Sequence, residues 1–252
     1  MKKQILVPVD FKVGMHLADY AQLLSHVDKK CFVGFFLRDF VRQLKSKSGD
    51  QEKSLVQSSL QEEARQLNLD FDFIKNHSNT NLLINQSRFA DLIIINPVTH
   101  TNILQLNQVF PDHFFDSIAC PVFLSEDLLK PYQEILVLFD YHQSGLVALK
   151  AFLSFFGKIS SNKKVTLLTV SPDDSPEIYF EKYLVGYLQK FFCDVGIAPL
   201  NNKNLAHQVI THATKLTQPV LVMGRTALDL LNNQKLATQV ADHHMSIFYS
   251  NA

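Results

Sequence analysis

Two aspartates stand at equivalent points of the chain and are its first candidates for chemistry. Asp10 ends the apolar run ILVPVD and Asp140 ends the apolar run ILVLFD, so the two carboxylates are 130 residues apart. A carboxylate at the end of a strand can accept hydrogen bonds from a bound ligand. Aspartate is also favoured there as the cap of the next helix or as part of the turn. Both interpretations stay open, and one carboxylate can serve both.

The other reactive side chains do not form a catalytic or metal-binding pattern. The sequence contains no G-x-x-x-x-G-K-[S/T], no G-x-G-x-x-G, no nucleophile elbow and no H-E-x-x-H. The adjacent His243 and His244 point in different directions on a helix, and His207 and His212 are five residues apart, so neither pair has the geometry of a zinc helix. We therefore predict a protein that is not an enzyme and that holds no metal.

The repeat that relates the two aspartates extends along the chain. Ala18 and Ala148 each stand eight residues past the aspartate, inside segments of helical apolar spacing. The apolar runs at 92–96 and 220–224 are 128 residues apart. Two copies of one α/β unit therefore fill the 252 residues, and we expect domains at 1–129 and 130–252. Pro131 marks the join, because it disfavours the continuation of either neighbouring element.

Short apolar runs alternate with longer segments of helical period, which is typical of a parallel sheet with crossover helices. The predicted strands are 4–10, 31–36, 70–74, 91–96 and 120–124 in the first half, and 134–140, 164–170, 219–224 and 245–250 in the second. A third strand of the second half is weakly marked near 198–200. The predicted helices of the first half are 13–28, 51–68, 79–88 and 111–118. Strands that are apolar at successive positions indicate a sheet covered on both faces.

Composition narrows the classes of partner. Lysine and arginine together number 24, as do aspartate and glutamate, so the formal net charge is zero and no global field would concentrate nucleic acid or an anionic membrane. No apolar run approaches the roughly 20 residues needed to span a bilayer. Three cysteines without C-x-x-C spacing suit reduced thiols. We therefore expect a cytoplasmic protein with no nucleic-acid or membrane partner.

The tandem arrangement, the opening ILVPVD and the closing GRTALDLLNNQ and SIFYS resemble two fused domains of the universal stress protein family. The resemblance covers nearly the whole chain. It implies an α/β fold of two repeated doubly wound domains, each with a five-stranded parallel sheet in the order 3-2-1-4-5. Ligands then sit where strands 1 and 4 diverge, so Asp10 and Asn96 should line one crevice, and Asp140 and Gly224 the other. The final strands, 120–125 and 245–250, should pair to form an intrachain pseudo-dimer. Whether two chains also associate as a homodimer stays an open question.

Members of this family that bind ATP wrap its phosphates with a loop of the form G-x-x-G-x9-G-[S/T], and the carboxylate after strand 1 lies near the adenosine. Glycines let the backbone approach the anion and turn amide hydrogens toward it. The matching stretch of the first half, residues 96–109, contains no glycine, and Pro97 removes a backbone donor. The resemblance therefore implies no ATP site of the usual kind in the first half.

The second half keeps more of the pattern. Gly224, Arg225 and Thr226 follow the fourth strand as the family has it, but Ala227 replaces the second glycine, and Asn233 and Gln234 stand near the third glycine and its hydroxyl partner. If a nucleotide binds, these residues and Asp140 should hold it, with Arg225 as an anion contact. Otherwise Gly224 serves a strand-to-helix turn.

Three functions remain, and the weakest of them is a purely structural scaffold with no ligand. The preferred one is a non-catalytic tandem universal stress protein with degenerate ATP-binding loops and no cofactor, which acts in a stress response through an unknown protein partner or small ligand. The alternative is a sensor that binds ATP or another nucleotide with the second domain only.

Overall fold

A computed structural model of the chain describes residues 2–9, 16–36, 47–74, 80–96, 114–170, 178–201, 203–227 and 245–251. The strands of the first half are β1 (Lys3–Val9), β2 (Lys30–Phe36), β3 (Phe71–Phe73), β4 (Leu92–Ile95) and β5 (Val122–Leu124). Its helices are α1 (Leu17–Leu23), α3 (Lys47–Gln66), α4 (Thr80–Ser87) and α6 (Phe114–Ser117).

The second half repeats this alternation of strands and helices. Its strands are β6 (Glu134–Phe139), β7 (Lys164–Val170), β8 (Asp194–Leu200), β9 (Pro219–Gly224) and β10 (Ser246–Ser250). Its helices are α7 (Gln143–Ser160), α8 (Ile178–Leu188) and α9 (Leu205–Ala213), with a short 3-10 turn, η2 (Arg225–Ala227), after β9. No helix in the described part of the chain is long and apolar enough to cross a membrane.

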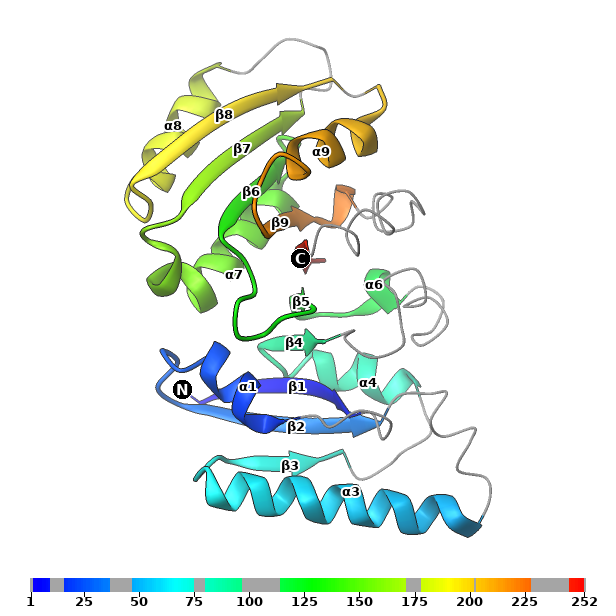
Figure 1. Cartoon of the computed structure of the whole chain (residues 1–252). Coiled ribbons are helices and arrows are strands. Elements are labelled where there is room, and N and C mark those ends of the chain that lie inside the picture. Colours follow the sequence, from blue (N-terminus) through cyan, green and yellow to red (C-terminus); the bar gives the residue numbers. More distant parts are fainter. Residues whose placement is uncertain are drawn as a thin grey trace.

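All ten strands belong to one sheet in the order β3-β2-β1-β4-β5-β10-β9-β6-β7-β8 (Figure 1). Each half has its third strand at the outer edge and its first strand in the middle, so the order within each half is 3-2-1-4-5. The pairs within each half are parallel, whereas β5 and β10 pair antiparallel, with Phe123 opposite Phe248. The final strands therefore cover each other's edges, as expected from the resemblance, and neither is left open to unwanted pairing.

Helices cover both faces of this sheet. One face packs against α1, α7 and α8 through side chains such as Leu24, Phe152 and Leu184, and the other packs against α4, α6 and α9. In Figure 1 the first group lies to the left of the sheet and the second group to its right. Because both faces are covered, strands such as β4 and β9 are buried at every position.

The predicted strands are confirmed to within two residues at each end, with one exception. The third strand of the second half runs from Asp194 to Leu200, four residues earlier than the predicted start. This strand, β8, is an edge strand with a mixed burial pattern and contains Gly196 and Pro199, so it lacks the apolar signal of a central strand.

Three predicted helix boundaries are wrong. The helix predicted at 13–28 begins only at Leu17, because the backbone of His16 is extended, and it ends at Leu23, because the Ser25 N–H bonds the Gln22 carbonyl in a tighter turn. Beyond this turn, the ring of His26 lies against the carbonyl oxygen of Phe155. The helix predicted from 51 already begins at Lys47, in a polar segment whose residues carry no apolar period.

Candidate functional site

The carboxyl ends of β6 and β9 form the switch point of the second half. Glu134 to Val137 of β6 pair with Pro219 to Val222 of β9, and the recorded pairing ends there, two residues before either strand ends. Asp140 follows β6, and Gly224 ends β9. The structure therefore places both predicted residues at the switch point, where open α/β sheets bind ligands.

Asp140 is built into the turn that starts α7. Its Oδ1 accepts a hydrogen bond from the His142 N–H at 3.2 Å, and His142 is the N-cap residue of α7. Between them, Tyr141 has a φ of 63°, a left-handed conformation that is uncommon for an aromatic residue. The turn role that the sequence left open for Asp140 is therefore present, and its carboxylate bonds the backbone at the start of the helix.

Gly224 has a packing role that explains its identity. A Cβ at this position would lie 2.5 Å from the carbonyl carbon of Ser144 and 2.6 Å from the backbone nitrogen of Gly145. Both are backbone atoms in the first turn of α7, so no side-chain rotation can make room. A bulky residue at 224 therefore cannot block a ligand and leave the fold intact, because any side chain there displaces β9 or α7.

The three described residues after Gly224, Arg225 to Ala227, lack the alternating right-handed and left-handed backbone that can form an anion-binding nest. Arg225 to Ala227 form a 3-10 turn, and among the described residues the left-handed ones are Asn68, Tyr141, Asn204 and Gln218, none of them in this turn. Alternation of right-handed and left-handed residues is one arrangement that turns successive backbone N–H groups toward an anion. Ala227, at the place of the family's second glycine, is 7% exposed and packs in the core.

Burial raises the pKa of the Tyr249 hydroxyl in β10, and Asp116 adds to the rise. Arg225, which is exposed, lies close enough to this hydroxyl to oppose the rise in part. The side chain of Thr226 is not described. Asn233, Gln234 and Asp10 lie outside the described residues, so the structure brings together only Asp140, Gly224 and the η2 turn. In the first half, Asn96 follows β4 and is partly buried.

Sequence reasoning missed an aromatic group beside this turn. The Tyr141 hydroxyl donates a 2.5 Å hydrogen bond to Glu181 of α8, and the ring of Phe139 stacks on Phe180 at 5.3 Å between centroids. Glu181 is only 9% exposed. These residues come from β6, from the turn between β6 and α7, and from α8, which lies some 40 positions further along the chain. The one signal for them in the sequence is the recurrence of aromatic residues over 179–187.

Comparisons with known proteins are consistent with this architecture. A universal stress protein from Archaeoglobus fulgidus DSM 4304 superposes with a TM-score of 0.65 over 98% of both chains, at 12% identity. A functionally unknown protein from Pseudomonas aeruginosa PAO1 superposes with a TM-score of 0.57 over 99% of this chain and 92% of its own, at 17% identity. No protein-family model and no curated protein matches the sequence. At these identities the likeness shows the fold, so the chain has the universal stress protein fold.

Proposed function

We propose that the chain is a non-catalytic, cytoplasmic tandem universal stress protein, with domains at 1–129 and 130–252, that acts in a stress response through a protein partner or a small ligand. Its ATP-binding loops are degenerate, and ATP is not its ligand. The antiparallel pairing of β5 with β10 supports an intrachain pseudo-dimer, because each half covers the edge that the other would expose.

The observation that carries this proposal is the η2 turn. A phosphate loop must turn several backbone N–H groups toward one anion, and glycines make that possible. Here the three described residues after β9 form a 3-10 turn that directs Ala227 into the core, and Gly224 lies against α7. The glycine that the chain retains is thus accounted for by packing alone.

The alternative function, a nucleotide sensor in the second domain, has one observation in its favour. Asp140 lies at the β6 end of the switch point, where a carboxylate can accept hydrogen bonds from ribose hydroxyls. Its bond to the His142 N–H explains the residue without a ligand, and for this reason we place the sensor second.

Titration of the purified chain with Mg-ATP by calorimetry, with thermal unfolding beside it, tests the proposal. A ligand at 100 times its Kd stabilises the folded state by about 2.7 kcal/mol. We expect neither heat nor a shift of Tm at millimolar nucleotide. Saturable binding at one site per chain would contradict the proposal.

If Mg-ATP binds, two variants show whether the second domain holds it. Asp140→Ala should abolish binding by a second-domain sensor. Asp194→Ala removes the same charge from an exposed carboxylate at the amino end of β8, whereas the switch point lies at the carboxyl ends of the strands, and it should leave binding unchanged.

A further inference from the structure

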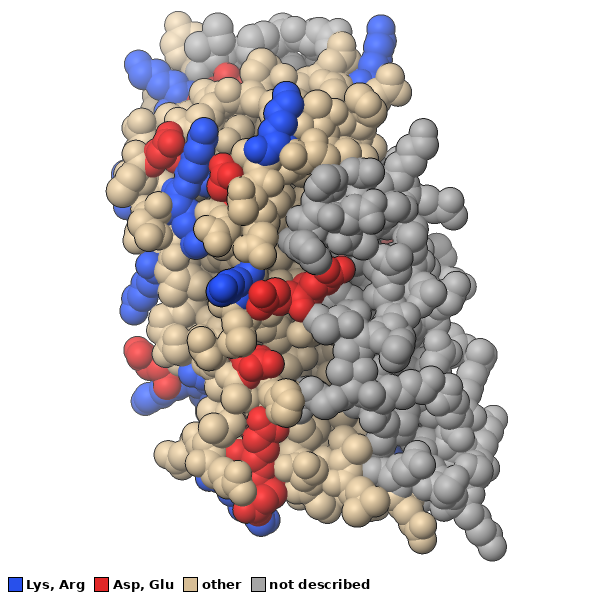
Figure 2. All heavy atoms as spheres, viewed as in Figure 1, with Lys and Arg blue, Asp and Glu red and all other residues tan. Residues whose placement is uncertain are grey.

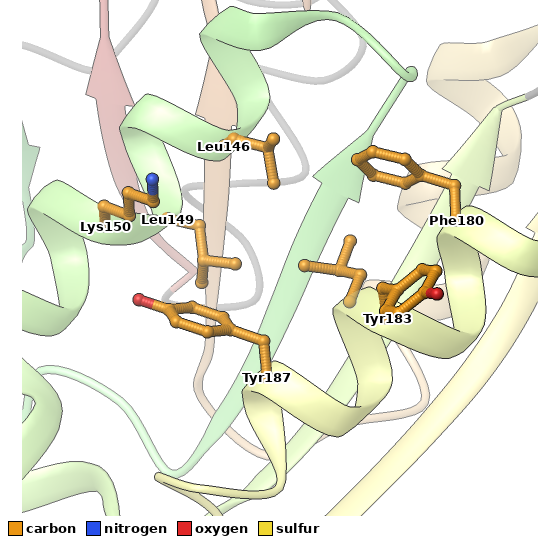
Figure 3. Close-up of a pocket in the computed structure, with 7 residues that line it drawn as sticks. Leu146, Leu149, Lys150, Phe180, Tyr183 and Tyr187 are labelled. Carbon is orange, nitrogen blue, oxygen red and sulfur yellow. The ribbon is translucent and has the colours of Figure 1, made fainter.

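A cavity of about 160 Å³ lies between α7 and α8, on the outer side of the second half. Its lining residues come from both helices: Leu146, Leu149 and Lys150 from α7, and Phe180, Tyr183, Leu184 and Tyr187 from α8. Figure 3 shows Lys150 and Tyr187 at one end of the cavity and Phe180 and Tyr183 at the other. The walls are thus aliphatic and aromatic, and the polar atoms of the lining side chains, on the ammonium group and the two phenols, form almost none of the wall surface.

Two of the aromatic residues of α8 that line the cavity are exposed, which is unusual for large side chains on one helix. Tyr183 is 79% exposed and Phe180 is 36% exposed, whereas Leu184 behind them is buried. A group of exposed aromatic side chains around a hollow is typical of a binding site. Single apolar residues scattered over a surface, in contrast, are normal and do not mark one.

The charge at the cavity favours an anion. Lys150 is the one charged residue of the lining, and Glu181 is the one acid among the described residues of α7 and α8. Glu181 is nearly buried and accepts the Tyr141 hydrogen bond, so it faces the β6–α7 turn. Elsewhere on the face that Figure 2 shows, Lys and Arg are interspersed with Asp and Glu in both the upper and the lower part of the molecule.

The size of the cavity limits the ligand to a small molecule. An engineered protein cavity of about 150 Å³ binds benzene, so the present volume matches one six-membered ring. A ring between Leu146, Leu149 and Leu184 would place a substituent at the end where Lys150 and Tyr187 lie (Figure 3). An ammonium group and a phenol both donate hydrogen bonds, and a carboxylate accepts from both.

We propose that the cavity between α7 and α8 is a binding site for a monocyclic aromatic carboxylate, with the ring against the leucines and the carboxylate at Lys150 and Tyr187. The site is separate from the switch point, so it stands or falls independently of ATP binding. It touches that region through Phe180, which lines the cavity and stacks on Phe139, the residue before Asp140.

The test uses benzoate as the probe and the full chain labelled with 3-fluorotyrosine. The sequence has seven tyrosines and no tryptophan, and single Tyr→Phe variants assign each fluorine resonance. We expect saturable shifts of Tyr183 and Tyr187, with Tyr20 and Tyr249 unmoved because they are buried elsewhere. A ligand of about nine non-hydrogen atoms should bind with a Kd in the millimolar range.

Matched variants test the carboxylate contact and the ring site separately. Lys150→Met keeps the apolar stem and should weaken benzoate binding about tenfold. Lys158→Met, an exposed lysine two turns further along α7 and outside the lining, should leave it unchanged. Leu146→Phe, at a half-buried lining position, should abolish binding by filling the cavity.

Three results would overturn the proposal. They are the absence of saturable shifts at about 10 mM benzoate, equal shifts of all seven tyrosines, and equal affinity for benzyl alcohol, which lacks the charge. Mg-ATP titration of the same sample is read separately, because its outcome concerns the switch point and not this cavity.

Discussion

The hydroxyl of Ser246 lies 2.9 Å from Oγ of Ser125, and this contact joins the two halves of the chain at the point where their final strands meet. Both side chains are almost fully buried, at 1% and 2% exposure. The same Ser246 hydroxyl contacts the carbonyl oxygen of Pro131, in the segment that links the halves. Its single proton is therefore shared between two acceptors beside the seam between β5 and β10, because the Ser125 hydroxyl donates its own proton to the Asp127 carbonyl.

Replacement of Ser246 by alanine should destabilise the whole chain. The change removes the donor that the partly buried Pro131 carbonyl and the buried Ser125 hydroxyl share, and an unsatisfied buried polar group costs about 1–3 kcal/mol. Urea unfolding should show a lower midpoint for Ser246→Ala. Ser58→Ala is the control, because Ser58 donates to a backbone carbonyl on the exposed surface of α3 and should change the free energy of unfolding very little. Equal effects of the two variants would mean that the seam contact contributes nothing.

Gly224→Ala should also destabilise the fold, by about 1–3 kcal/mol, since the new methyl group overlaps the Ser144 backbone. Gly186 provides the contrast: it lies in α8, and a Cβ there meets nothing within 4 Å. Gly186→Ala should stabilise by up to about 1 kcal/mol, because alanine is the better helix former. Thermal unfolding of both variants measures the difference. Tolerance of alanine at 224 would show that α7 can move away from β9.

The Tyr141 hydroxyl should matter for stability through its buried partner. Tyr141→Phe keeps the ring but removes the donor of the 2.5 Å bond to Glu181, which should reduce the free energy of unfolding by about 1–3 kcal/mol. Tyr183→Phe serves as the control, because Tyr183 is an exposed tyrosine on α8, the helix that carries Glu181. This change should alter the free energy of unfolding by no more than about 0.5 kcal/mol. Equal stability of the two variants would show that Glu181 finds another partner.

The sequence predicted the sheet well because its strands are central. β4 and β9 are apolar at every position, and such runs are recognisable without knowledge of their neighbours. The repeat then supplied the order of the strands through the family resemblance. The edge strand β8 was located poorly, since Gly196 and Pro199 interrupt it and one of its sides faces no strand.

The candidate site was predictable only where it follows from the repeat. Asp140 and Gly224 lie at strand ends that the repeat marks, and the structure places both at the switch point. The Tyr141 to Glu181 bond and the cavity beside Leu149 depend on how α8 packs against α7. In the sequence, apolar residues at helical spacing look the same whether they fill a core or line a cavity, so the cavity could not be inferred.

The three cysteines should differ sharply in reactivity toward a thiol reagent such as DTNB at pH 8. Cys193 is exposed and should react at once. Burial, opposed in part by Lys2, raises the pKa of the partly buried Cys31, which should react slowly. Burial, with a smaller effect of Asp91, raises the pKa of Cys120 to about 12, so this thiol should react only when the chain unfolds. Rapid reaction of Cys120 in the native protein would contradict its placement in the core.

The same shift of Cys120 predicts a loss of stability in alkali. The thiol ionises near its ordinary value of 9.0 when unfolded and near 12 when folded, so the unfolded chain releases its proton first. The contribution of Cys120 is therefore complete below about pH 9 and is lost as the pH rises toward 12, by at most about 1.4 kcal/mol per pH unit. Burial raises the pKa of Tyr20 and Tyr132 in the same direction. Urea unfolding of wild type and Cys120→Ala from pH 8 to 10.5 isolates the cysteine, and we expect a shallower decline in the variant; parallel curves would show that Cys120 ionises alike in both states.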